Sequence, residues 1–346
     1  MPPESLSPPP IAVVLATYNG ARYLRELLES LAQQTRLPSE LIVSDDGSTD
    51  ATLDVVRDFT PSAPFPVRLH QNEARLGYTD NFLQAMEKVA APLVAFCDQD
   101  DVWLPRKLER CGAALLNPAV TLAVHNAHVT DSALTIQRPL YADLKGETTA
   151  SPRTLDPFMN PLGFTMVFRR EHVARFDGRQ RPRNFMRDAK SRLCHDQWVY
   201  FLSHAVGRIA LIAEPLALYR QHGGNAFGVA SGPTTSLQDS RSTDVIAYEE
   251  RRDGCLDYAA FWGAQSALPD SLRAEAEAAT AYYGRLARRF DARVRLNRSR
   301  NLARRCATLF SLAVTGGYRA RGRGGLGSRA FVKDSLRVVR GARSPS

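Results

Sequence analysis

The segment "VAFCDQDDVW", residues 94–103, changes from apolar to acidic within a few positions. Its first four residues form an apolar run typical of a buried strand, and Asp98, Asp100 and Asp101 follow at once. Three carboxylates at the end of a buried strand repel one another, so their presence together favours a cation nearby. The segment therefore predicts a buried strand with a polar site at its carboxyl end.

Apolar runs and helical patterns alternate through the residues that precede this segment. "IAVVLAT", residues 11–17, has no polar alternation, as expected for a strand covered on both faces. Leu24, Leu27, Leu28 and Leu31 then recur at the spacing of one helical face. Further strands are predicted at 40–45, 65–72 and 92–98, with helices at 50–59 and 79–90 between them. This alternation predicts an α/β fold with a mostly parallel sheet flanked by helices.

The pattern after Pro105 is less regular. We predict four parts: a disordered Pro-rich N-terminus (1–10), an α/β domain (11–228), a Ser/Thr-rich linker (229–241) and a helical, basic C-terminal region (242–346). Within the domain, helices are predicted at 108–116 and 194–207, strand or hairpin material at 120–131, and a strand at 163–170.

Polar clusters follow three of the predicted strands, and ligands of open parallel sheets bind beyond the carboxyl ends of the strands. "TYNG", residues 17–20, is explained by a turn when taken alone. In "SDDGSTD", residues 44–50, the last residues can cap the next helix. This leaves Asp45 and Asp46, whose position favours accepting hydrogen bonds from a ligand such as a pyrimidine base. We expect the three clusters to share one cleft.

The acidic cluster "DQDD" has three interpretations: a solvated turn, a cap for the helix entered through Pro105, or a site for a hard divalent ion. Magnesium binds one or two protein carboxylates together with substrate phosphates. Asp98 and Asp100, separated by one residue, could share an ion with a diphosphate, and we favour this interpretation. Asp101 is expected to support them or to cap the helix.

Two later segments add candidate residues. In "HDQW", Asp196 either caps its helix or acts as a general base that takes a proton from a substrate hydroxyl. In "YRQHGGN", His222 is either a packed loop histidine or a ligand of a metal or diphosphate, and Arg220 can equally be a surface charge.

Composition suggests a globular cytoplasmic protein. The five cysteines show no paired spacing, the N-terminus lacks the features of a secretory signal, and "CATLFSLAV" is too short to span a bilayer. Residues 285–346 hold 17 Lys and Arg and two Asp, a net charge of +15, so the first 284 residues carry −6 of the total of +9. The basic stretch 285–310 mixes arginines with apolar residues, which favours peripheral contact with an anionic membrane near a lipid-linked acceptor over a plain solvated helix. Nucleic-acid binding is not expected, because no aromatic platform or recognition motif accompanies the charge.

Five motifs in order, "VVLATYNG", "LIVSDDGSTDAT", "NEARLGYTDNF", "VAFCDQDDVWLPRKL" and "HDQW", resemble the family 2 inverting glycosyltransferases, which have the GT-A fold. The resemblance covers about residues 11–228. "LGYTDNF", "DQDDVW" and "YRQHGGN" are similar to bacterial polysaccharide glycosyltransferases often described as rhamnosyltransferases. The resemblance implies a metal-dependent enzyme that moves one sugar, with inversion, from a nucleoside diphosphate sugar to a hydroxyl of a cell-surface glycan or lipid-linked saccharide.

The resemblance also implies roles for individual residues. The nucleotide and donor would be bound by Thr17, Tyr18, Asp45, Asp46, Arg75 and Asp98. Mn²⁺ or Mg²⁺ would be held by Asp98 and Asp100, with Asp100 the stronger candidate and His222 a further one. Asp196 would be the catalytic base. The segment between the donor and base motifs would face the acceptor through Gly163 and Thr165.

The chain departs from the family pattern at one position, because His195 stands where the family commonly has Glu before the base. The Gln-x-x-Arg-Trp element of processive synthases is absent, so a single sugar addition per encounter is expected. dTDP-rhamnose is the donor implied by the motif wording, and UDP-sugars come next. A nucleotidyltransferase and a non-catalytic nucleotide-sugar-binding protein remain alternatives.

Overall fold

The first half of the chain alternates strands and helices as predicted. The computed structural model describes residues 9–185, 190–223, 245–319 and 325–340. The first elements in chain order are β1 (Ile11–Thr17), α1 (Ala21–Ala32), β2 (Glu40–Asp45), α2 (Thr52–Phe59), η1 (Thr60–Ser62), β3 (Val67–Gln71), α3 (Tyr78–Glu87) and β4 (Leu93–Asp98). Helix α1 buries the predicted leucine face, since Leu24, Leu27, Leu28 and Leu31 are all 0% exposed.

The second half of the domain completes the sheet with mixed strand directions. Its elements are β5 (Val102–Trp103), α4 (Lys107–Ala114), β6 (Val120–Thr130), β7 (Ile136–Pro139), β8 (Thr148–Ala150), η2 (Gly163–Thr165), β9 (Met166–Arg169), α5 (Arg170–Ala174), η3 (Gly178–Gln180), α6 (His195–Val206) and β10 (Arg208–Arg220). The main strand order is β3-β2-β1-β4-β9-β6-β10-β5. Strands β3, β2, β1 and β4 are parallel, whereas β9 runs antiparallel to both β4 and β6.

The strand predicted at 163–170 begins later than expected. Residues Gly163–Thr165 form a 3-10 turn, and pairing starts only at Met166 with β6 and at Val167 with β4. The carbonyl of Phe164 accepts a hydrogen bond from Lys107 Nζ at 2.7 Å instead of joining the sheet ladder. A polar side-chain contact therefore takes the place of strand pairing at the Phe164 carbonyl.

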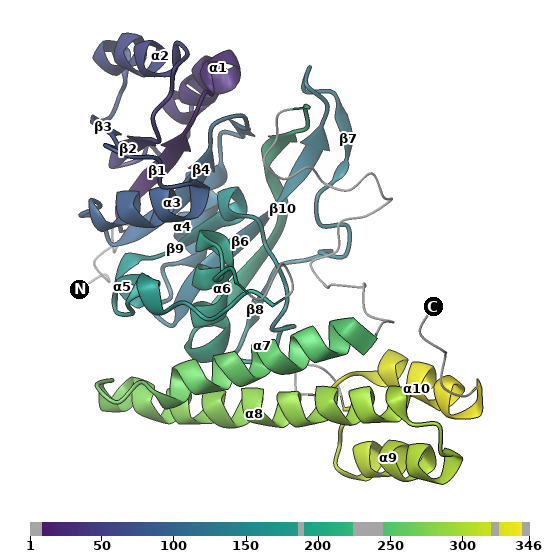
Figure 1. Cartoon of the computed structure of the whole chain (residues 1–346). Helices are drawn as coiled ribbons and strands as arrows, with labels where there is room; N and C mark the ends of the chain where they lie inside the picture. Colours follow the sequence, from purple (N-terminus) through teal and green to yellow (C-terminus); the bar gives the residue numbers. More distant parts are fainter. Residues whose placement is uncertain (1–8, 186–189, 224–244, 320–324, 341–346) are drawn as a thin grey trace, which may run out of the picture.

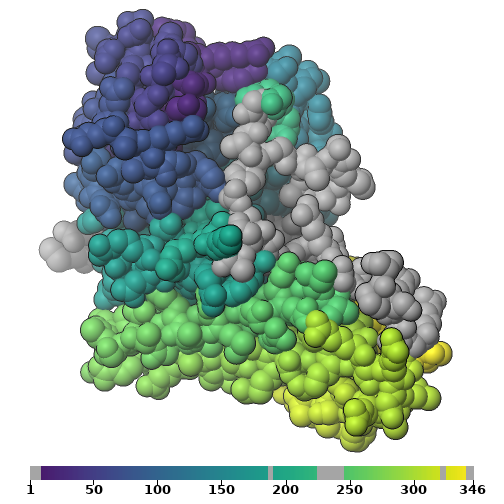
Figure 2. Space-filling model, in the orientation of Figure 1, coloured from purple at the N-terminus to yellow at the C-terminus, as the bar shows by residue number. Residues whose placement is uncertain are grey.

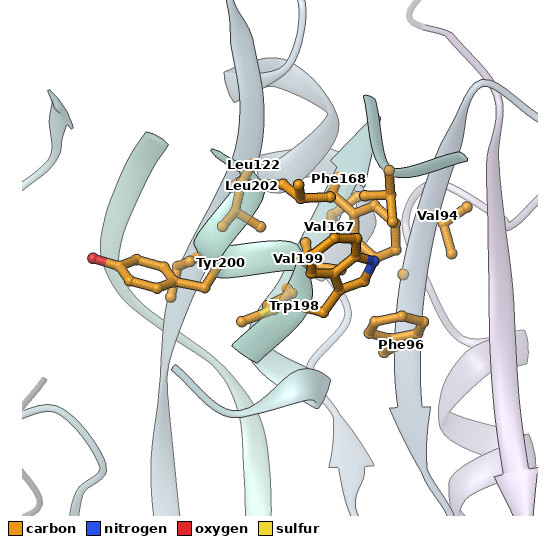
Figure 3. Close-up of a cluster of buried hydrophobic side chains, with 14 of the residues drawn as sticks. Val94, Phe96, Leu122, Val167, Phe168, Trp198, Val199, Tyr200 and Leu202 are labelled. Atoms are coloured by element: carbon orange, nitrogen blue, oxygen red, sulfur yellow. The ribbon is translucent and has the colours of Figure 1, made fainter. Parts of the chain in front are cut away.

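Helix α6 packs on the middle of the sheet (Figure 3). Its Trp198, Val199 and Leu202 lie over strand residues such as Phe96 and Phe168, and all five side chains are at most 1% exposed. This apolar contact fixes the N-terminal end of α6 relative to the end of β4. The helix that carries the predicted base is thus attached to the strand that carries the acidic cluster.

The C-terminal region is helical, as predicted, and it packs on the α/β domain (Figures 1 and 2). It consists of α7 (Val245–Gly263), α8 (Asp270–Arg298), α9 (Leu302–Val314) and α10 (Ser328–Arg340). Phe201 of α6 lies 4.6 Å, between ring centroids, from Tyr258 of α7, and His204 Nδ1 lies 2.8 Å from the hydroxyl of Tyr283 on α8. One apolar core therefore runs from the sheet into α7 and α8.

Several predicted boundaries lie outside the described residues. The predicted linker 229–241 and the domain end at 228 fall there, and so do residues 1–8 of the predicted disordered N-terminus. No helix in the described part of the chain has both the length and the apolar character needed to cross a bilayer.

The basic stretch 285–310 does not form one amphipathic surface helix. Helix α8 ends at Arg298, and its Leu286, Phe290 and Val294 are at most 5% exposed. These side chains already pack inside the protein, so they are not available to a bilayer. The part of this prediction that placed the contact on 285–298 is wrong, because the tertiary structure buries the apolar face.

Candidate active site

The ends of β1, β2 and β4 lie side by side. Thr17 pairs with Asp45, and Ala16 pairs with Asp98, so the three polar clusters begin at the same edge of the sheet. The Gln99 side chain joins two of the clusters: its Oε1 accepts from Tyr18 N at 2.9 Å and its Nε2 donates to Tyr18 O at 3.1 Å. The three clusters thus meet at one edge of the sheet, as expected, and the cleft that they would share stays a prediction.

Asp45 and Asp46 make their hydrogen bonds within the chain. Asp45 is 0% exposed, and it accepts bonds from Thr17 Oγ1 and from Ser48 N at 2.9 and 2.8 Å. Asp46 is 3% exposed and accepts from Leu76 N at 2.7 Å and Gly77 N at 2.8 Å. Asp45 thus offers no surface to a ligand in this conformation, which argues against direct contact between Asp45 and a base. Thr17 is 1% exposed, which likewise argues against direct contact between Thr17 and the nucleotide.

The predicted nucleotide residues Tyr18 and Arg75 contact each other. The Arg75 guanidinium carbon lies 3.9 Å from the centroid of the Tyr18 ring, and Tyr18 is 37% exposed. An exposed aromatic ring with a cation beside it can stack on a base and pair with a phosphate. Their role in nucleotide binding stays a prediction.

Three carboxylates from two elements share one electrostatic environment. Burial, together with the negative charges of Asp100 and Asp196, raises the pKa of Asp98 to about 7. Asp100 belongs to the loop after β4, whereas Asp196 lies in the first turn of α6. The edge-on contact of His195 with Phe96, at 5.0 Å between ring centroids, places Asp196 near the end of β4, although 95 positions separate it from Asp101 in the sequence. Concentrated negative charge of this kind is relieved by a cation.

The helix cap of α6 is not Asp196. The N-cap is Cys194, whose side chain bonds the backbone of Gln197, and the Gln197 side chain accepts from Cys194 N at 3.0 Å. Asp196 Oδ1 accepts from Gln197 N at 2.7 Å. Cys194 therefore occupies the N-cap position, while Asp196 accepts a hydrogen bond from an N–H group of the first turn, and its role as a base stays a prediction.

His195 behaves as a buried aromatic residue. Its ring stacks on Phe82 at 4.2 Å between centroids and meets Phe96 edge-on at 5.0 Å. Both ring nitrogens lack a hydrogen-bond partner, and burial lowers the pKa of His195. A Cβ at Gly163 would lie 2.7 Å from His195 Nε2 and 3.6 Å from Asp196 Cβ. The absence of a side chain at Gly163 is what lets this segment lie against the α6 terminus.

Thr165, the other predicted acceptor residue, is 0% exposed. Its hydroxyl donates to Leu162 O at 2.7 Å and lies 3.3 Å from the Tyr141 hydroxyl. This placement argues against direct contact between Thr165 and an acceptor. Gly163 is also buried, but it adjoins Asp196.

Arg220 holds the acidic loop from behind. Its side chain is 3% exposed, its Nε donates to Asp100 O at 2.9 Å, and its backbone N donates to Asp101 Oδ1 at 3.1 Å. The surface-charge interpretation of Arg220 is wrong, because the residue ends β10 directly beside this loop. Asp101 is 0% exposed, so it supports the loop, as expected, and does not face a ligand.

His222 contacts the predicted metal ligand. Its Nε2 lies 2.9 Å from Asp100 Oδ2, and its ring lies 4.7 Å from the Tyr23 ring between centroids. His222 and Asp100 are therefore close enough to bind one ion together, or the histidine can orient the carboxylate.

Lys107 is a site residue that the sequence did not single out. It is 0% exposed, and its ammonium lies 3.2 Å from the Trp103 ring centroid. Burial lowers the pKa of Lys107 to about 7, while acidic neighbours that include Asp101 and Asp98 act in the opposite direction. The only sequence signal was its position within the motif that carries Asp98.

The donor set fits a hard divalent ion. The described residues contain no group of three or more His, Cys, Asp or Glu side chains arranged to hold a metal by themselves. Two carboxylates from Asp98 and Asp100 are nevertheless the usual protein share of a magnesium site that is completed by substrate phosphates and water.

Comparison with known proteins adds to this geometry. Residues 12–176 match the family model described as Glycosyl transferase family 2. The chain carries a family 2 glycosyltransferase domain. It is 29% identical over 240 residues to an uncharacterised glycosyltransferase of Nostoc sp., an alignment covering 67% of this chain and 70% of the relative. It is 27% identical over 225 residues to the dTDP-rhamnosyl transferase RfbG of Shigella flexneri, covering 62% of this chain and 73% of the relative.

The fold of the chain is also found in a solved structure. Residues 1–349 of S. aureus TarS superpose with a TM-score of 0.54 and 16% identity, covering 96% of this chain and 90% of that one. TarS has also been solved with UDP-GlcNAc, with a TM-score of 0.51, 17% identity and coverage of 88% of this chain and 80% of that one. The family-model match ends at residue 176, so Asp196 and His222 lie beyond it.

Proposed function

We propose that this family 2 glycosyltransferase transfers one sugar, with inversion and with a divalent metal, from a nucleoside diphosphate sugar to an acceptor hydroxyl. The observation that carries the proposal is the contact between β4 and the start of α6, where Phe96 meets His195 edge-on at 5.0 Å between ring centroids, because this contact brings the Asp98–Asp100 loop and Asp196 to the same part of the molecule. Asp98 and Asp100 suit a metal-diphosphate and Asp196 suits a base, and a transfer reaction needs both.

The donor is proposed from the comparisons together with the site. The name of the Shigella relative supports dTDP-rhamnose, and the TarS complex supports a UDP-sugar as the second choice. Tyr18 and Arg75 are proposed to bind the nucleotide. Asp46 is proposed to reach the base once the loop at Leu76 and Gly77 shifts, since that loop now occupies its oxygens.

Asp98 and Asp100 are proposed to hold Mn²⁺ or Mg²⁺, and His222 to ligate the ion or to orient Asp100. The ion, when bound, neutralises the negative charge that grows on the departing diphosphate. The chain's own contribution is to fix the two carboxylates: Arg220 holds the backbone of the loop through Asp100 O.

Asp196 is proposed to act as general base. The acceptor oxygen forms a bond to the anomeric carbon, the bond from that carbon to the diphosphate oxygen breaks, and the hydroxyl proton passes to the Asp196 carboxylate. Attack from the face opposite the leaving group inverts the configuration without a covalent sugar-enzyme intermediate. The proposed acceptor is a hydroxyl of a cell-surface glycan or a lipid-linked saccharide.

The test is a transfer assay with purified protein and a panel of nucleoside diphosphate sugars. A positioned base contributes about 10²–10⁴-fold, so Asp196→Asn should lose most of the transfer while still binding donor. Asp100→Ala should lose both transfer and metal-dependent donor binding. Near-normal transfer by Asp196→Asn, or wild-type transfer in the presence of a chelator, would contradict the proposal.

The same assay separates the two alternatives. A nucleotidyltransferase would release pyrophosphate from a nucleoside triphosphate and a sugar phosphate. A non-catalytic binding protein would bind the donor without releasing nucleoside diphosphate when acceptor is present.

A further inference from the structure

The last two helices carry an unusual share of the exposed apolar surface. Of the fourteen large apolar side chains that are exposed among the described residues, seven lie on α9 and α10. They are Leu302, Phe310, Val314, Phe331, Val332, Leu336 and Val339, with exposed fractions from 43% to 83%. Both helices lie at one end of the long α7–α8 pair, away from the sheet (Figure 1).

The apolar residues of α9 form one face. At about 100° per residue, Leu302, Phe310 and Val314 fall within an arc of about 140°. The small residues in the same arc are also exposed: Ala303, Cys306, Ala307 and Ala313. The buried residues Arg305 and Leu312 lie on the opposite side, toward the protein. The exposed side of α9 is thus its apolar side, the reverse of a helix that only covers a core.

Helix α10 has the same arrangement. Phe331, Val332, Leu336 and Val339 fall within about 140° of its circumference, and all four are exposed. The side turned inward carries Asp334, which is 0% exposed and accepts hydrogen bonds from Arg293 and from the Tyr318 hydroxyl.

The exposed charged residues in the described parts of α9 and α10 are all positive. Asp334 is the only acidic residue between Arg298 and the C-terminus, and it is buried in its ion pair with Arg293. The exposed cationic side chains of this region are Arg298, which pairs with Glu249 of α7, and Arg300, Arg304, Arg319, Arg329 and Lys333. Among the residues that the structure describes, α9 and α10 therefore present apolar and cationic groups without an exposed carboxylate.

This combination selects one partner. A second copy of the chain would bring two sets of uncompensated positive charges together, which is unfavourable. A nucleic acid would satisfy the charges but not the apolar faces. A bilayer with anionic head groups satisfies both, because apolar side chains enter the boundary of the acyl region while Lys and Arg pair with the phosphates.

We propose that α9 and α10 form a docking face, made of their exposed apolar and cationic side chains, that binds an anionic phospholipid bilayer. The apolar part of this face begins at Leu302, after the stretch of α8 whose apolar side chains are buried. Bilayer binding by this face is independent of sugar transfer, although it places the enzyme at the surface where a lipid-linked acceptor would lie under the proposed function.

The experiment is vesicle flotation with the full chain. Neutral phosphatidylcholine vesicles are compared with vesicles of equal parts phosphatidylcholine and phosphatidylglycerol. The test variant is Phe310→Ser with Val314→Ser, and the matched control is Leu37→Ser with Ile136→Ser, which changes two exposed apolar residues elsewhere. Burying an apolar side chain as large as Phe contributes about 1.5–3 kcal/mol of binding free energy. The test variant should therefore bind anionic vesicles at least about tenfold more weakly than the parent chain.

The control should bind like the parent chain, neutral vesicles should bind weakly, and high salt should reduce binding. Equal binding by test variant and parent, or no preference for anionic vesicles, would overturn the proposal. A lipid-free dimer that the test substitutions disrupt, without vesicle binding by the parent, would also overturn it. Asp196→Asn should float like the parent, so a failure of the proposed function is distinguishable from a failure of the docking face.

Discussion

Replacing Gly163 by alanine tests how the active site is positioned. The added Cβ would lie 2.7 Å from His195 Nε2, well inside normal contact distance. The ring cannot move away easily, because it is stacked on Phe82 and meets Phe96 edge-on. Either Gly163 or the start of α6 must shift, and Asp196, the next residue after His195, would shift with it.

The expected magnitudes follow from this overlap. Overpacking a buried site costs about 1–3 kcal/mol of unfolding free energy, so the melting temperature of Gly163→Ala should fall. Misplacing a catalytic group by about 1 Å can cost about 10²-fold in rate, so kcat should fall far more than donor affinity. Steady-state transfer kinetics, donor binding by calorimetry and thermal unfolding measure the three effects.

Two controls sharpen the test. Gly178→Ala is the matched substitution, since its Cβ would meet nothing closer than 3.6 Å. Its kcat should equal that of the parent. In the His195→Ala background, Gly163→Ala should cost much less than in the parent, because the overlapping ring is gone. Wild-type kcat and stability in Gly163→Ala, or full additivity in the double variant, would refute the reasoning.

Three further predictions concern stability and loop support. Burial lowers the pKa of His172 and of His204 to about 4. Their folded pKa values lie below the unfolded value of about 6.5, so the stability that each neutral histidine contributes is present above pH 6.5 and is lost as the pH falls toward 4. At pH 5 each histidine should lower the unfolding free energy by about 2 kcal/mol relative to pH 7. Denaturant unfolding between pH 7 and pH 5 measures it, and a flat profile would contradict it. Arg220→Lys removes the guanidinium bonds behind the Asp100 loop and should weaken Mn²⁺-dependent donor binding by about 10–100-fold; unchanged metal titrations would rule out this support. Asp45→Asn should lower unfolding free energy by about 1–3 kcal/mol with little change in the donor affinity of the folded protein, whereas lost affinity at unchanged stability would assign Asp45 to the ligand.

The sequence predicted the sheet and the meeting of the polar clusters well. Continuous apolar runs such as 11–17 are typical of strands covered on both faces, and parallel strands bring their carboxyl ends to one edge. The structure differs from the prediction at residues whose contacts are made with segments distant in sequence. Residues 163–165 read as strand, but Lys107 takes the carbonyl of Phe164 out of the sheet.

The amino-acid pattern by itself determined the α/β fold, the strand that ends in Asp98, the helix that begins near Asp196 and the helical basic C-terminus. These depend on local periodicity, which is written in consecutive residues. Tertiary structure alone decided that Arg220 is buried behind the acidic loop, that His195 packs as an aromatic ring, and that the apolar face of α8 is covered while those of α9 and α10 are not. Burial and hydrogen-bond partners are set by contacts between distant segments, so no local pattern specifies them.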